Sequence, residues 1–118
     1  MQEHLVEYLK ENFNPDAIIL HGSRARGMAR EGSDWDFILL YTGETTHKND
    51  RATVHGQNIE YSVVVLPVTD IWETFGAKLN HAKVVYEKAD AGSTLLSQAE
   101  KLYNDGVHWS DIKKEAHK

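Results

Sequence analysis

The chain has 118 residues, a formal net charge of −5 at pH 7 and 41% hydrophobic residues, a composition typical of a globular domain. The absence of cysteine excludes a disulfide framework and a cysteine-type zinc site, and the acidic balance argues against broad, sequence-independent binding to nucleic acid. No apolar run approaches the length of a membrane span, and the first residues lack the apolar segment of a signal peptide. We therefore expect a cytoplasmic protein with a single domain over residues 1–118, ending in a polar tail at about 107–118.

The start of the chain predicts a helix, a strand and a short helical turn. Apolar residues at i, i+4 and i+8 predict an amphipathic helix over residues 2–13. Pro15 then disfavours helix in the residue before it, so the helix should end there. The apolar run over 17–21 predicts a short buried strand, and residues 24–29 can form one or two helical turns.

The middle of the chain predicts a central strand and a hairpin. Residues 34–42 are apolar on both faces beyond their first positions, which is typical of a strand inside a sheet. A polar loop should follow over 43–50. Residues 51–55 and 58–66 then predict a hairpin that turns at Gly56-Gln57, because β-branched residues flank a glycine-containing turn.

The last third of the chain predicts a helix, an edge strand and a final helix. Thr69 or Asp70 can cap a helix that runs to about residue 80. The short apolar run 82–86 predicts an edge strand. A last helix is expected over about 94–104, stopped by Gly106.

Two aspartates and a Gly-Ser turn carry the clearest chemical signal. Asp34 and Asp36 are spaced i, i+2 at the start of a strand, so their side chains should project from one face about 7 Å apart. Such carboxylates can share divalent cations, and Mg²⁺ takes oxygen ligands. Gly22-Ser23 ends the preceding strand, where backbone N–H groups and a hydroxyl can hold an anion. Together these features predict phosphoryl or nucleotidyl transfer, although each alone is read more simply as a turn or a solvated strand end.

An acid in the hairpin and two arginines extend this candidate site. Glu60 lies within an apolar strand, where a carboxylate is costly to bury without a partner. A metal shared with Asp34 and Asp36 would be that partner, and an edge-strand residue facing water is the alternative. Arg24 and Arg26 concentrate positive charge beside the motif, and arginine forks fit phosphate oxygens. Either arginine can instead be a surface charge.

The spacing of these residues resembles a known signature. Gly22-Ser23, ten residues and then Asp34-x-Asp36 is similar to the motif of the minimal nucleotidyltransferases, a branch of the DNA polymerase β superfamily. The resemblance covers roughly residues 15–90. It implies an α+β nucleotidyltransferase fold, with a mixed, mostly antiparallel sheet of roughly four or five strands and helices packed on one face. Glu60 stands where the family has its third carboxylate, often an aspartate.

The family's mechanism then implies roles for these residues. The implied metal-binding and catalytic residues are Asp34, Asp36 and Glu60, which would hold two Mg²⁺ ions. The implied nucleotide-binding residues are Gly22, Ser23, Arg24 and Arg26. The reaction would transfer a nucleoside monophosphate, AMP from ATP, to a hydroxyl group with release of pyrophosphate, and Glu60 could also act as general base.

The acceptor is the part of the reaction that the motif does not specify. Many aminoglycoside-type relatives build the acceptor pocket from a second, helical domain, which the predicted elements here do not include. The acceptor is then another macromolecule, or a homo-oligomer or a partner chain supplies the missing wall. Small members of this kind AMPylate an all-helical HEPN ribonuclease toxin on tyrosine, so the resemblance implies the antitoxin of a toxin–antitoxin pair. The alternatives are a non-catalytic nucleotide-binding or protein-interaction module and, ranked lower, an aminoglycoside-type antibiotic adenylyltransferase.

Overall fold

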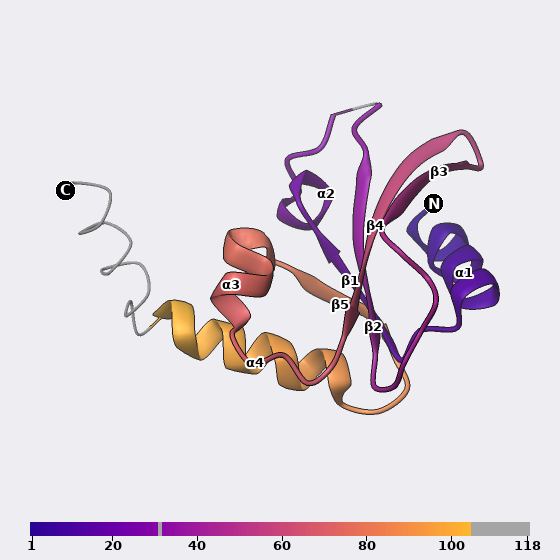
Figure 1. The fold of residues 1–118 in the computed structure, drawn as a ribbon. Helices are drawn as coiled ribbons and strands as arrows, with labels where there is room; N and C mark the ends of the chain where they lie inside the picture. Colours follow the sequence, from indigo (N-terminus) through magenta and orange to yellow (C-terminus); the bar gives the residue numbers. More distant parts are fainter. Residues whose placement is uncertain (31, 105–118) are drawn as a thin grey trace.

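The computed structural model describes residues 1–30 and 32–104, which form a five-stranded sheet covered by helices (Figure 1). The helical elements are α1 (Gln2–Phe13), α2 (Ser23–Arg26), α3 (Ile71–Phe75), the 3₁₀ turn η1 (Gly76–Leu79) and α4 (Ala91–Asn104). The strands are β1 (Ala17–His21), β2 (Trp35–Tyr41), β3 (Asp50–Val54), β4 (Gln57–Val65) and β5 (Lys83–Glu87). The expected stop at Gly106 and the expected tail at 107–118 lie outside the described residues.

The sheet is mixed and mostly antiparallel, which confirms the predicted fold class. Its strand order is β3-β4-β2-β1-β5. Within the described strands β2 and β4 pair in parallel, and every other neighbouring pair is antiparallel. The strand predicted for the centre, β2, lies in the middle of the sheet, and β5 lies at an edge as predicted.

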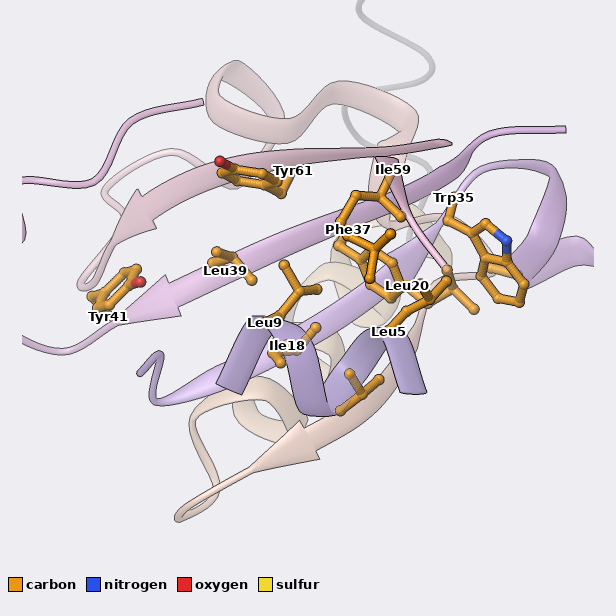
Figure 2. Packing of buried hydrophobic residues seen from close by; sticks show 13 residues of the cluster. Leu5, Leu9, Ile18, Leu20, Trp35, Phe37, Leu39, Tyr41, Ile59 and Tyr61 are labelled. Atoms are coloured by element: carbon orange, nitrogen blue, oxygen red, sulfur yellow. The ribbon is translucent and has the colours of Figure 1, made fainter. Parts of the chain in front are cut away.

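Helices cover both faces of the sheet, so the expectation of helices on one face is wrong. Alternate side chains of β1 and β2 are apolar in both directions, and each set needs its own cover. On one face Ile18, Phe37 and Leu39 pack against Leu5 and Leu9 of α1 (Figure 2). Figure 1 shows α3 and α4 on the side of the sheet away from α1.

The second face carries a separate core beneath α3, η1 and α4. Ile19 and Ile38 are buried there with Phe75, Leu79 and Leu95. Burying side chains of this kind contributes about 1.5–3 kcal/mol each relative to leaving them in water. The two cores thus pack on opposite faces of β1 and β2, and this packing fixes which residues of β2 face which helices.

Several boundaries differ from those predicted: α2 is Ser23–Arg26 rather than 24–29, and α4 begins at Ala91 rather than at about residue 94. Glycines explain two further differences. The helix expected to run to residue 80 ends at Phe75, because Gly76 adopts φ +56° and the chain continues as η1. Asp70 caps α3 as predicted, accepting a hydrogen bond from the Glu73 amide at 3.0 Å. The hairpin turns at His55-Gly56, one residue earlier than expected. Both turn residues have positive φ, the two-residue geometry that matches the twist of hairpin strands.

No helix within residues 1–30 and 32–104 is long and apolar enough to cross a membrane.

Candidate active site

Four polar side chains lie in one register row across the sheet. Arg51 of β3 is opposite Glu60 of β4, Glu60 is opposite Asp36 of β2, and Asp36 is opposite His21 of β1. Along β2, Asp36 alternates with Phe37 and so shares the face of Ile38, which carries the second core. The row therefore continues the core of α3 and η1 into a polar region at one end of the sheet.

Asp36 and Glu60 form the centre of this row, with their carboxyl groups in hydrogen-bonding reach of each other. Partial burial, the hydrogen bond with Glu60 and the charges of Glu60 and Asp34 together raise the pKa of Asp36 to about 6. Two carboxylates hydrogen-bond only when one of them is protonated, since ionised oxygens are acceptors alone. The pair therefore disfavours carrying two negative charges by itself, and a bound cation would relieve that repulsion.

Asp34 does not lie as close to Asp36 and Glu60 as the sequence predicts. It lies just before β2 and is exposed, while Asp36 is half-buried. Its charge still contributes to the raised pKa of Asp36. Within the described residues, no three His, Cys, Asp or Glu side chains are grouped closely enough to hold a metal ion as they stand. The structure thus brings Asp36 and Glu60 together and leaves Asp34 at the rim.

Glu60 has a second partner on its other side. The Arg51 Nη2 atom lies 2.9 Å from the Glu60 Oε1 atom, with 78% of the Arg51 side chain and 45% of the Glu60 side chain exposed. This ion pair lies between two cavities, because Arg51 and Glu60 line both of them. The first has a volume of about 510 Å³ and is also lined by Asp36, Asn49 and Lys78. The second has a volume of about 500 Å³ and is also lined by Asp34 and Asn58. Because β4 lies inside the sheet, Glu60 is not the edge-strand residue of the alternative interpretation.

The cavity beside Asp36 is also lined by two basic side chains that are not part of the predicted site, His21 and Lys78. His21 lines it, and burial, followed by the charge of Lys78, lowers the pKa of His21 to about 4, so its imidazole is neutral near pH 7. Lys78 reaches this cavity from η1, and no spacing in the sequence connects it to the aspartates. The position of Arg51 could have been found, because a turn at His55-Gly56 places it opposite Glu60.

Gly22 brings the Gly-Ser turn directly against the acidic pair. Its φ of +77° and ψ of −158° lie in a region that is essentially restricted to glycine. A Cβ atom at this position would also collide with Asp36 Oδ2. The single-turn helix α2 begins at the next residue, Ser23, and the Arg26 amide donates to the Gly22 carbonyl at 3.2 Å. The turn and the carboxyl pair predicted from the motif are therefore neighbours in space.

The two arginines of α2 have different surroundings. Arg26 is exposed, and its charge contributes to lowering the pKa of His21. Arg24 instead donates from Nη2 to the Ser33 carbonyl at 2.9 Å, and its guanidinium lies 4.4 Å from the centre of the Trp35 ring. Its position is already determined by contacts with the segment that leads into β2.

The chain is similar to a known protein family over most of its length. The family model for polymerase β nucleotidyltransferases matches residues 3–101. The chain belongs to this family. The resemblance seen in the Gly-Ser and Asp-x-Asp spacing is thereby confirmed, and with it the nucleotidyltransferase fold. No curated protein sequence matches the chain.

A solved structure supports the same fold over almost the whole length. It covers 99% of this chain and 98% of its own, with a TM-score of 0.57 and 14% sequence identity. That structure is described as a toxin–antitoxin with AMP-PNP. At this level of identity, the likeness establishes the arrangement of helices and strands.

Proposed function

We propose that this polymerase β-type nucleotidyltransferase domain transfers AMP from ATP to a hydroxyl group, in a reaction that depends on Mg²⁺. The observation that carries the proposal is the Asp36–Glu60 pair, whose carboxyl groups are in hydrogen-bonding reach of each other and lie directly against the Gly22 turn. Oxygen ligands of this kind suit Mg²⁺. Asp36 and Glu60, joined by Asp34 from the rim, would hold the metal. When bound, it would supply positive charge against the phosphates and the attacking oxygen.

Other residues of the chain would bind the phosphates of ATP and accept the proton of the acceptor. Gly22 and Ser23 would bind the terminal phosphates of ATP through backbone amides and the serine hydroxyl, and the exposed Arg26 would offset their charge. The acceptor oxygen attacks the α-phosphorus, the bond to the bridging oxygen breaks and pyrophosphate leaves. The acceptor proton passes to Glu60, which lines the cavity beside Asp36.

We propose a protein as the acceptor. The cavity beside Asp36 is open enough to admit a side chain from another molecule, and its lining mixes acidic, basic and amide groups. The solved structure of similar fold is a toxin–antitoxin, which favours a protein partner. With the sequence resemblance, this points to the antitoxin of a toxin–antitoxin pair that places AMP on a tyrosine of a small helical HEPN toxin.

A non-catalytic nucleotide-binding module is the second candidate, and one observation favours it. Arg51 already neutralises Glu60, and three carboxylates are not assembled within the described residues. A domain in this arrangement could bind a nucleotide without completing the transfer.

Transfer of label from α-labelled ATP tests both candidates. The chain would be incubated with Mg²⁺ and either cell lysate or the product of the neighbouring gene, and compared with Asp36→Asn. Asp50→Asn is the matched control, because Asp50 lines the same cavity without being the register partner of Glu60. Label on a protein band that is lost in Asp36→Asn and kept in Asp50→Asn supports the transferase. Mg²⁺-dependent ATP binding without label supports the binding module. If neither property depends on Asp36, the site is wrong.

A further inference from the structure

We propose that Arg24 is a positioning residue. With Trp35 and Gln57 it forms a brace that joins α2, β2 and β4, the three elements that carry the candidate active site. The inference rests on the proposed function for its consequences in catalysis. Its structural part rests on the contacts of these three residues with one another and with the Ser33 carbonyl. Trp35 packs in the first core, on the face of the sheet away from the Asp36–Glu60 pair.

The first contact of the brace ties α2 to the start of β2. The Arg24 guanidinium donates to the Ser33 carbonyl at 2.9 Å and stacks over Trp35. A stacked guanidinium that also makes a hydrogen bond is held in direction as well as in distance. Ser33 and Trp35 flank Asp34 in the sequence, so this contact fixes the backbone on both sides of that aspartate.

The second contact ties β2 to the hairpin. The Trp35 Nε1 atom donates to the Gln57 side-chain oxygen at 3.1 Å, and 8% of Trp35 is exposed. Gln57 is the first residue of β4, three positions before Glu60. Figure 2 shows Trp35 at one end of the first core, with its indole nitrogen pointing out of the cluster. The indole is therefore the middle member of a chain of contacts that runs from α2 to β4.

The surroundings of Arg24 indicate a structural role rather than a role in binding phosphate. Its Nε atom is buried and has no hydrogen-bond partner within the described residues. Leaving a charged donor unsatisfied is costly, and the stacking and the Ser33 bond offset that cost. Residues two apart on a helix point to different sides. Arg26 therefore lies away from the brace and is exposed to solvent, where it can meet phosphates.

Whether Arg24→Ala lowers or raises the affinity for a cation shows whether Arg24 positions the site or acts only through its charge. Removing a positive charge near a cation site strengthens cation binding by Coulomb's law. Removing a group that positions the carboxylates weakens it, typically by about 10-fold or more. We expect Arg24→Ala to lower the affinity of the chain for Mn²⁺ by about 10-fold. Arg26→Ala, the matched loss of charge, should leave that affinity unchanged or raise it.

The experiment measures Mn²⁺ binding to the full chain by electron paramagnetic resonance, without nucleotide. Gln57→Ala removes the far end of the brace without altering charge and should also weaken Mn²⁺ binding, and Arg24→Lys should recover part of the affinity lost in Arg24→Ala. In steady-state transfer, Arg24→Ala should lower kcat, and Arg26→Ala should raise KM for ATP. Mn²⁺ affinity that rises in both arginine variants overturns the positioning role.

Amide hydrogen exchange decides the structural part independently of any metal or activity. Exchange at Trp35–Phe37 should accelerate in Arg24→Ala and in Gln57→Ala but not in Arg26→Ala, with α1 unchanged as a control for folding. Unchanged exchange at the start of β2 in both brace variants overturns the proposal. If the wild-type chain binds no Mn²⁺ while exchange responds as expected, the metal site fails and the brace stands.

Discussion

Asp36 and Glu60 lie directly opposite each other across the parallel β2–β4 pair, with their carboxyl groups in hydrogen-bonding reach. In most sheets a facing pair of acids is destabilising, because like charges repel. Here a proton on Asp36 reduces the repulsion at low pH, because the pKa of Asp36 is raised to about 6. The free energy of unfolding should therefore depend on pH in a way that identifies this pair.

The first prediction concerns Asp36 in the metal-free protein. Its pKa is about 6 when folded and 3.8 ordinarily, so the folded chain binds more protons between pH 4 and 6. This contribution to the free energy of unfolding falls as pH rises through that window. Asp36→Asn removes it, and should be stabilising relative to wild type above pH 6 and nearly neutral below pH 4. Urea unfolding in EDTA from pH 4 to 7 measures this; an equal difference at all pH values would contradict it.

The second prediction concerns His21, whose titration acts in the opposite direction. Its pKa is lowered from 6.5 to about 4 on folding, so the unfolded chain binds more protons in this range. The histidine's contribution to the free energy of unfolding therefore rises with pH from 4 to 6.5. His21→Gln should remove that rise, leaving a profile that falls with pH. The same unfolding series measures it, and wild type should have a flatter profile than either single variant.

The third prediction uses two glycines of the motif as a matched pair. Gly27 has φ +71° with open space around its Cβ position, so Gly27→Ala should cost only the strain of a left-handed residue, about 1–2 kcal/mol. Gly22→Ala should cost more, because its Cβ also meets Asp36 Oδ2. Unfolding measures both costs. AMP transfer should be abolished in Gly22→Ala and retained in Gly27→Ala; equal activity in the two variants would argue against close packing of the turn on Asp36.

The fourth prediction concerns the ion pair between Arg51 and Glu60. Both side chains are substantially exposed, and an exposed ion pair contributes about 0–1 kcal/mol. Arg51→Ala should therefore change stability little but release Glu60, raising Mn²⁺ affinity about two- to fivefold. Lys78→Ala removes a charge from the same cavity and is the control. A rise as large for Lys78→Ala as for Arg51→Ala would show that total charge, not the ion pair, sets the affinity.

Much of the fold follows from local patterns in the sequence. The alternation in β2 correctly places Asp36 on the face of Ile38 and opposite to that of Phe37. The same alternation, read fully, also requires helices on both faces, since Ile18 and Ile19 point in opposite directions and both need cover. The break of the third helix was harder to foresee, because a lone glycine such as Gly76 is tolerated within many helices.

The candidate site was predictable where residues are close in sequence and less so where the sheet brings them together. The spacing of Gly22 and Asp36 carries the motif, and their contact in space follows from the pairing of β1 with β2. Arg24 and Arg26 are chemically identical in the sequence, and the stacking on Trp35 that separates their roles becomes visible with the fold. Lys78 lines the cavity from η1, whose Leu79 packs in the second core with Ile19 and Ile38.

In the hairpin formed by β3 and β4, different parts of the chain set the register of β4 on β2 and the register of β3 on β4. The parallel alignment of β4 with β2 follows from apolar side chains facing the two cores, whereas the alignment of β3 with β4 follows from the turn at His55-Gly56. A longer turn would shift Arg51 past Glu60 without moving Glu60 from Asp36. The tip of the hairpin is therefore a modular position, where evolution or design can change which β3 residue lies beside Glu60 while the carboxyl pair keeps its place.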